Sequence, residues 1–434
     1  MDISESGLFV LGGPRDRPFN PFRALRSDSA KAIAAEVLNE LQNYEVHFKL
    51  RQRARRATDQ ATLKQMVGAI VADLVHRVLT VPDGWVAVPL SKRVLGKRTR
   101  YGAPVLSKTL PHVLNCLSAP ELNFAELRKG VINDFGPRNM QSTIRAGQRL
   151  LTRIETFGVE LADLGVQKGE ESIILKAAKR GHWDGGEWVD YQDNARTCRY
   201  RAELERINDS LAQADIYFDG VTKDGRLIDE GDRVLRRYFN NGSFQQGGRL
   251  FGGFWQSISK AERASGLTID GEEVVTLDFE QMAARVLYGL AKVTPPEGDA
   301  YDIPGYENCR EGVKQVFNSL RFFEKPLFRF PKGTRELFPK GASVREVVAV
   351  ISQKHEAIAH LFCQGIGFQD MFIESEILVD VLLKLLDQRI TALPVHDAVI
   401  VAKSKAPLVK EVMLSVFQAH TGVTGAVEEE RMKG

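Results

Sequence analysis

The sequence predicts an α+β fold, with a mainly helical, basic N-terminal region followed by a region in which strands alternate with helices. Apolar residues recur at helical spacing over 31–50 and 61–79, which indicates two amphipathic helices. Short apolar runs at 274–279 and 391–404 have the length and composition of strands. Helical patterns surround these runs, so the C-terminal region combines both kinds of structure.

The length of 434 residues and the 43% apolar content are enough for two or three domains. We expect a basic helical region at 1–120, in which residues 80–120 fit a small winged helix, a helical region at 121–239, and the α+β region at 240–434. Segments 140–165 and 195–216 carry the clearest helical patterns of the middle region. Residues 240–253 are rich in Gly and Asn, which predicts flexible backbone or a close approach.

The composition argues against several classes of protein. No run of eighteen apolar residues occurs and the N-terminus lacks a secretory pattern, so we expect no membrane span and a cytoplasmic location. The four cysteines are far apart and form no CxxC pair, which makes disulfides and a structural zinc site unexpected.

The net charge of +3 is unevenly distributed. Residues 1–110 contain 18 Lys and Arg against 10 Asp and Glu, whereas the remainder is acidic. Two basic segments, 49–56 and 91–102, would suit a phosphate backbone. A solvated helix face and a hairpin are the alternative interpretation of these segments.

Two acidic residues lie at the ends of predicted strands. Asp278 ends the run 274–279 before a helix in which Gln281 and Arg285 share a face, and Asp397 lies with His396 at the tip of a predicted hairpin. Two carboxylates brought together repel each other unless divalent cations lie between them. Taken singly, an Asp at a strand end is more often a helix cap, and a His-Asp turn is more often solvated.

The segment 309–325 reads as a helix with Arg310, Lys314, Asn318 and Phe322 at intervals of four residues. This spacing places two cations and an aromatic ring along one stripe, where a triphosphate and a base or sugar could bind. A surface helix with an aromatic core edge explains the phenylalanines equally well, but it leaves the spacing of the cations to chance.

These three segments, in this order, resemble motifs A, B and C of the family A DNA polymerases and the related single-subunit, phage-type RNA polymerases. Motif A of the DNA enzymes reads DYSQIELR, and this chain has DFEQMAAR at 278–285. Motif B has the form R-x3-K-x3-F-x3-YG, matched by Arg310, Lys314 and, in the tyrosine place, Phe322. Motif C reads VHDE, and here it is VHDA at 395–398. Upstream, GGRLFGGFWQ at 247–256 is similar to the family's TGRLSS and N-x-Q segments.

The resemblance covers about 240–425 and implies a right-hand polymerase with an antiparallel palm sheet, reduced fingers at about 295–345 and a helical thumb drawn from 121–239. It implies that Asp278 and Asp397, with the Phe279 carbonyl, bind two Mg²⁺ ions, with Mn²⁺ as an alternative. It further implies catalysis by Asp278, Asp397 and Lys314; substrate binding by Arg310, Lys314, Asn318, Phe322, Gln281 and Ala283; and nucleic-acid binding by Arg249, Gln256, Arg285, Gln369 and His396.

The chain departs from the family's pattern in ways that affect function. Ala283 stands where DNA polymerases have a glutamate that opposes the ribose 2′-hydroxyl, and Ala398 replaces the acid after Asp397. Both positions look more like the RNA enzymes. Only 119 residues separate Asp278 from Asp397, so small fingers are expected, and no upstream D-x-E strand indicates a proofreading exonuclease.

The leading hypothesis is a compact DNA-directed DNA polymerase of phage, prophage or plasmid type with weak sugar discrimination. Its partners would be primer–template DNA or RNA, nucleoside triphosphates and replication accessory proteins. One alternative is a primase or RNA polymerase on the same palm. Another is a non-catalytic DNA-binding replication protein with a relic palm.

Overall fold

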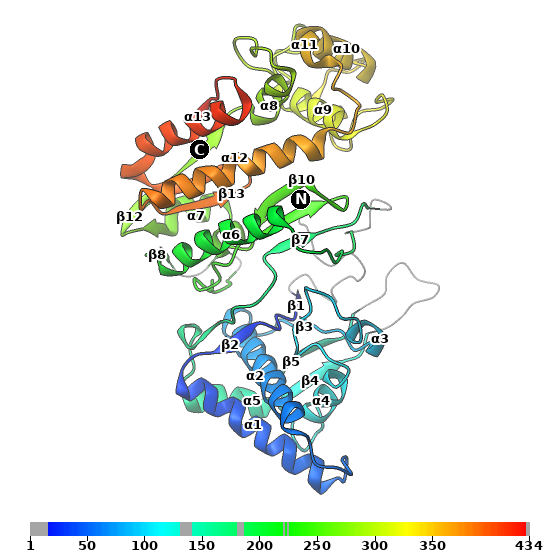
Figure 1. Ribbon diagram of the computed structural model, residues 1–434, viewed down its shortest axis with the longest axis vertical. Coiled ribbons are helices and arrows are strands. Elements are labelled where there is room, and N and C mark those ends of the chain that lie inside the picture. The colour runs from blue at the N-terminus through cyan, green and yellow to red at the C-terminus, as the bar shows by residue number, and fades with distance from the viewer. Residues whose placement is uncertain (1–15, 131–140, 180–185, 220–221, 224, 431–434) are drawn as a thin grey trace. The chain divides into compact units, whose positions relative to one another are not determined.

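The computed structural model describes residues 16–130, 141–179, 186–219, 222–223 and 225–430. The chain forms two compact units (Figure 1). The first comprises Met1–Glu171, Lys179–Asp190 and Gly220–Asp232, and the second comprises Ser172–Ala178, Tyr191–Asp219 and Arg233–Gly434. The boundaries expected at 120 and 239 do not coincide with this division, because the chain passes between the units several times.

Two long helices dominate the first unit. Helix α1 begins after Ser27, whose side chain accepts the N–H of Ala30, and buries Ile33, Val37 and Leu41. The predictions for 31–50 and 61–79 are confirmed. The helices of the unit are α1 (Asp28–His47), α2 (Ala57–Thr80), α3 (Lys92–Leu95), α4 (Leu110–Leu117), α5 (Gln148–Phe157) and the 3₁₀ turn η1 (Leu161–Asp163).

Short strands complete the first unit and correct one prediction. The four-stranded sheet has the order β1 (Arg17–Pro18), β3 (Val86–Ala87), β5 (Thr143–Ala146) and β4 (Ala125–Arg128), and β2 (Arg23–Leu25) pairs with β6 (Leu164–Val166). The continuous helix predicted over 140–165 is therefore wrong, since its start is β5. Strand β5 pairs with β4 across an intervening segment and buries Ile144 completely, a long-range gain that outweighs local helix propensity.

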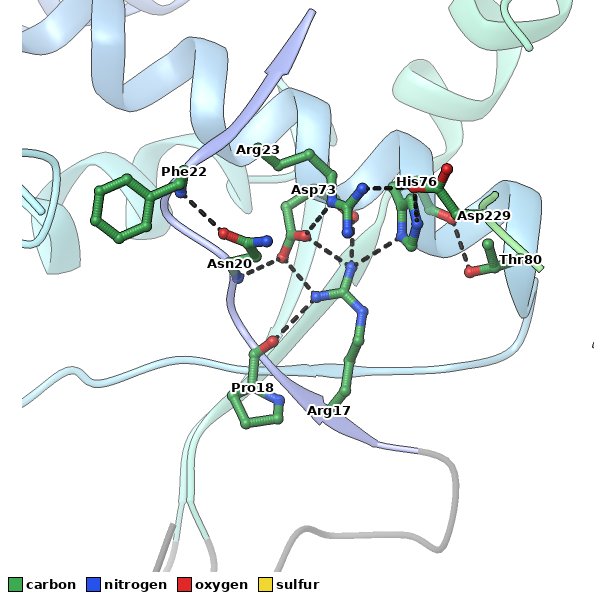
Figure 2. A network of polar contacts seen from close by, with 9 residues as sticks. All are labelled: Arg17, Pro18, Asn20, Phe22, Arg23, Asp73, His76, Thr80 and Asp229. Carbon is green, nitrogen blue, oxygen red and sulfur yellow. Dashed lines mark hydrogen bonds and ion pairs between the residues drawn. The ribbon is translucent and has the colours of Figure 1, made fainter. Parts of the chain in front are cut away.

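A buried charge network ties β1, β2 and α2 together (Figure 2). Asp73 of α2 is fully buried, and both of its carboxylate oxygens accept hydrogen bonds from Arg17, at 2.7 and 3.0 Å. The Arg23 guanidinium lies 3.3 Å from Asp73 and 2.9 Å from Asp229, and Nε2 of His76 lies 3.0 Å from Asp229. Asp229 is thereby attached to β2 and α2 by buried opposite charges.

The stability of this attachment should depend on pH through Asp229. Burial by itself raises the pKa of Asp229, but the adjacent His76 ring and Arg23 guanidinium outweigh it and lower the pKa to about 2. A carboxyl whose folded pKa lies below its ordinary value stabilises the fold above that ordinary value and loses this contribution as the pH falls through the folded pKa. We expect Asp229→Asn to lower the free energy of unfolding by about 2 kcal/mol at pH 7. Urea unfolding of both proteins should show this difference shrinking between pH 4 and pH 2, and a difference independent of pH would contradict the assignment.

The second unit is built on an antiparallel sheet. Its order is β13 (Ala392–Val395), β14 (Ala398–Ala402), β12 (Glu272–Phe279), β11 (Leu267–Ile269) and β8 (Ile216–Phe218), with β15 (Val427–Glu429) also paired to β12. The strand predicted at 274–279 and the hairpin predicted within 391–404 are both confirmed. Val399, Ile400 and Val401 of β14 are fully buried, as expected for a central strand.

A second, smaller sheet has the order β7 (Ile173–Leu175), β9 (Arg236–Asn240) and β10 (Ser243–Phe251). The register of β10 shifts around Gly247 and Gly248, and both glycines have positive φ. A Cβ on Gly248 would lie 2.5 Å from the Ser375 hydroxyl, so only glycine allows β10 to approach the helix that carries Ser375. The close backbone approach predicted for 240–253 is confirmed.

The helices of the second unit pack on the sheets and on one another (Figure 1). A separate hydrophobic core is formed by the helices α8, α9, α10 and α11 and by the segments between them, and it includes Phe317, Val347 and Ile358. The segment 295–345, expected to form small fingers, lies within this cluster. No helix of the described chain combines the length and apolar character needed to cross a bilayer. The helices are α6 (Ala195–Gln213), α7 (Lys260–Gly266), α8 (Met282–Ala291), α9 (Arg310–Phe322), α10 (Val344–Lys354), α11 (Glu356–Ala359), α12 (Gly367–Asp387) and α13 (Ala406–Thr421), with 3₁₀ turns η2 (Phe254–Gln256), η3 (Arg335–Leu337) and η4 (Lys403–Lys405).

Candidate active site

The two predicted carboxylates meet at one end of the larger sheet. Asp278 is the penultimate residue of β12, and it pairs in register with Ala398, the first residue of β14. Asp397 immediately precedes Ala398 in the tight β13–β14 turn, where His396 adopts a left-handed φ of 58°. Residues 119 positions apart in the chain are thus placed on neighbouring strands by the pairing of β12 with β14.

The electrostatics of this pair are unfavourable without a counter-charge. Oδ1 of Asp278 is buried and has no hydrogen-bond partner among the described residues. Burial raises the pKa of Asp278 to about 7, with Asp397 and then Glu430 adding to the rise and Lys314 opposing it. Burial also raises the pKa of Asp397, with Glu374 adding to the rise and Arg249 opposing it. Both shifts report carboxylates that are destabilised in their ionised form.

These features fit a hard divalent cation. An orphaned carboxylate oxygen beside a second carboxylate is a site that a bound Mg²⁺ would neutralise, and Mg²⁺ characteristically takes one or two carboxylates and completes its shell with water and substrate oxygens. Within the described residues, no group of three or more His, Cys, Asp or Glu side chains is arranged to hold a metal by itself. The Phe279 ring is buried against Phe417, and the predicted role of its carbonyl remains a prediction.

Helix α9 carries the predicted triphosphate contacts. Arg310 is exposed and forms an ion pair with Asp299, which raises the pKa of the guanidinium. Lys314 is also exposed, and its positive charge opposes the rise in the pKa of Asp278. Asn318 accepts a hydrogen bond from Arg321, at 2.9 Å. The predicted helix at 309–325 is therefore confirmed, and its first two cations face outward.

The aromatic position at the end of α9 is also accessible. The Phe322 side chain is 37% exposed and packs edge-on against Phe368 at 5.3 Å between ring centroids. Gly367 makes this packing possible, because a Cβ there would lie 2.5 Å from the Phe322 ring. The Arg321 guanidinium lies over the ring, 5.6 Å from its centroid, so Phe322 is held by its neighbours and only part of its ring is exposed.

A chain of ion pairs connects α9, α12 and β10, and sequence reasoning found only part of it. Arg321 lies 2.5 Å from Asp370 and 3.2 Å from Glu374, and Arg249 lies 3.0 Å from Glu374. Burial raises the pKa of Asp370 to about 6 although Arg321 opposes the rise. Arg321 and Asp370 were missed, and the available signal was the spacing of four residues between Asp370 and Glu374, which places both acids on one face of α12.

Three predicted contact residues have side chains engaged by the protein's own backbone. Gln256 donates to the Pro394 carbonyl at 2.8 Å, Gln281 accepts the N–H of Ala300 at 2.8 Å, and Arg285 donates to the Thr424 carbonyl at 2.9 Å. These bonds connect η2 to β13 and the start of α8 to the loops that contain Ala300 and Thr424, so the three residues hold the frame of the site. Their contacts with substrate or nucleic acid remain predictions.

The remaining predicted residues occupy different environments. Gln369 is exposed. His396 is also exposed as a whole residue, but partial desolvation of its ring lowers its pKa. Ala283 lies on the buried side of α8 with 9% of its surface exposed. Arg249, predicted to contact nucleic acid, is one-third exposed and already paired with Glu374.

Comparison with known proteins adds little to this picture. No protein-family model and no curated protein matches the chain. The solved structures similar to it include the POL domain of Pol1 from M. smegmatis, in a complex with DNA primer-template and dNTP. The sequence identity is 14% and the TM-score is 0.25, over 93% of this chain and 81% of that chain. A similarity at this level supports no inference about the function of this chain.

Proposed function

We propose that this protein is a template-directed nucleotidyltransferase, which extends the 3′-hydroxyl of a nucleic acid with nucleoside triphosphates by a two-metal mechanism. The observation that carries the proposal is the pair Asp278 and Asp397 on adjoining strand ends, with an orphaned carboxylate oxygen. The order of the three polymerase-like motifs along the chain supports it, and so does the field of Lys314 at Asp278.

In this proposal Asp278 and Asp397 hold two Mg²⁺ ions, which would lower the pKa of the primer hydroxyl and neutralise charge on the triphosphate. The hydroxyl gives up its proton to solvent and its oxygen forms a bond to the α-phosphorus, the bond from that phosphorus to the bridging oxygen breaks, and pyrophosphate leaves. Lys314 supplies a proton to the departing pyrophosphate. The carboxylates can act in this way because metal binding removes the repulsion that otherwise favours their protonation.

Arg310 and Lys314 bind the triphosphate in this proposal. The Arg310–Asp299 pair does not prevent this, because the guanidinium is about half exposed and an exposed ion pair is worth little. A triphosphate can therefore displace Asp299 from Arg310. The exposed part of the Phe322 ring supports the sugar or base of the incoming nucleotide.

Sugar selection is predicted to be weak, because Ala283 offers no bulk and no hydrogen-bond partner to a ribose 2′-hydroxyl. A site without such a group rejects an added hydroxyl by no more than about 100-fold. Single-nucleotide primer extension should therefore give kcat/KM values for ribo- and deoxyribonucleotides that differ by less than this factor. Exclusion of ribonucleotides by several further orders of magnitude would contradict the prediction.

Ala283 and Ala398, the two positions that look more like the RNA enzymes, favour a second candidate function, a primase or RNA polymerase on this palm. Synthesis from a template without a primer would support it. Strict dependence on a primer would favour the DNA polymerase. Both assays use the full chain with Mg²⁺ or Mn²⁺.

A further inference from the structure

The first unit contains a large basic pocket, whereas the acidic pair Asp278 and Asp397 belongs to the second unit. Its volume is about 950 Å³. It is lined by the segment after α1, by the loop after α3 and by the start of α4, represented by Arg51, Lys97 and His112. The two basic segments recognised in the sequence, 49–56 and 91–102, thus contribute to one cavity although 34 residues, 57–90, separate them.

The charge of the pocket is strongly positive. Arg55 is neutralised by Glu45, which accepts both of its hydrogen bonds at 2.6 Å. The four other Lys and Arg side chains of the lining are exposed, and none has a carboxylate partner recorded among the described residues; they are Arg51, Lys97, Arg98 and Lys108. Asp59 is the one acidic residue of the lining.

The backbone of the loop gathers these cations. A Cβ on Gly96 would lie 2.5 Å from Cε and 3.2 Å from Nζ of Lys108, so the lysine lies across this glycine, which directly precedes Lys97 and Arg98 in the chain. Like charges held together in this way repel each other, and the repulsion is relieved by a bound polyanion. The pocket is therefore arranged for several anionic groups at once.

The remaining lining indicates which part of a polyanion binds. Its buried members are small and aliphatic, including Leu63, Leu95 and Val113. Among the residues that the structure describes, no Phe, Tyr or Trp lines the pocket, so these residues offer no stacking platform of the kind that holds unpaired bases. Phosphate contacts position a nucleic acid without reading its sequence.

We propose that this pocket binds the phosphate backbone of nucleic acid, independently of sequence, as a contact separate from the Asp278–Asp397 site. The choice of nucleic acid among polyanions rests on the proposed function. The pocket would then strengthen the hold of the protein on its template or product.

The test is binding of the full chain to a DNA duplex, without nucleotides, over a range of salt concentrations. The variant K97Q/R98Q/K108Q removes three phosphate-binding charges, and each contact contributes about 0.9 to the slope of log K against log salt. We expect the slope to become shallower by about 3 and the affinity to fall by about tenfold or more. The variant K97R/R98K/K108R should retain wild-type binding.

A matched control removes three exposed lysines outside the pocket, in K31Q/K64Q/K405Q. Equal losses in control and pocket variants, or an unchanged slope in the pocket variant, would overturn the proposal. Chemical acetylation of Lys97 and Lys108 gives a further test. The proposal would also be overturned if anionic lipid vesicles or a nucleoside triphosphate protected these lysines and the duplex did not. Asp278→Asn separates the two proposals. If this variant loses primer extension but keeps pocket-dependent DNA binding, both proposals are supported. If the wild-type protein binds DNA through the pocket but never extends a primer, only the proposed polymerase function is refuted.

Discussion

Asp278→Asn and Asp397→Asn should each reduce nucleotide incorporation by at least about 10³-fold, because a catalytic metal supplies several kcal/mol of transition-state stabilisation and each 1.36 kcal/mol is a factor of ten. Asparagine keeps the size of the side chain but cannot bear the charge that holds the ion. Primer extension under single-turnover conditions, with Mg²⁺ in excess, measures the loss.

The same variants should remain folded and bind DNA as the wild type does. Oδ1 of Asp278 has no hydrogen-bond partner among the described residues, and burial together with Asp397 disfavours its ionised form, so a neutral side chain removes repulsion and does not lower the thermal unfolding midpoint. Asp302→Asn, an exposed carboxylate of the same unit, is the matched control and should leave extension unchanged. Full activity of both active-site variants would refute the mechanism, whereas absence of extension by the wild type would favour the non-catalytic hypothesis.

Asp73→Asn should destabilise the first unit by about 3–5 kcal/mol, the cost of removing one partner from a buried ion pair. Asparagine can still accept the N–H of Asn20, which lies 3.1 Å from the Asp73 carboxylate. It leaves the Arg17 and Arg23 guanidinium groups without the charge that Figure 2 shows between them. Chemical unfolding followed by circular dichroism measures the free energy.

A neutral substitution at an exposed carboxylate provides the comparison. Asp28 is fully exposed, and its nearest ion-pair partner, Lys31, lies 3.8 Å away. Asp28→Asn should therefore leave the free energy of unfolding unchanged. If Asp73→Asn is no more destabilising than Asp28→Asn, the buried network does not hold the first unit together.

Local patterns predicted the elements that depend on local interactions. The helical spacing over 31–50 and 61–79 led to α1 and α2, and the apolar runs led to β12 and to the β13–β14 hairpin. The helix expected over 140–165 failed at its start, because pairing of β5 with β4 buries Ile144 through a partner that no local window contains.

The sequence also identified some, but not all, of the residues that form the candidate active site. Asp278, Asp397, Arg310 and Lys314 were identified from spacing and motif order. Arg321 and Asp370 were not, because their significance depends on the packing of α9 against α12, which brings two buried charges within 2.5 Å. The engagement of Gln256 by the Pro394 carbonyl was equally invisible, since it joins residues 138 positions apart.

The sequence by itself predicted which residues carry the proposed chemistry: two acids at strand ends, cations at intervals of four residues on one helix, and an alanine where the resembled DNA polymerases have a glutamate. The first two follow from periods of two and 3.6 residues and from chain order, which need no partner to be read. The third follows from the resemblance to the polymerase motifs. Only the tertiary structure decided that the acids share one sheet end, that Arg17 and Arg23 surround Asp73, and that two distant basic segments line one pocket. Those facts arise from strand register and helix packing, whose free energy belongs to long-range contacts.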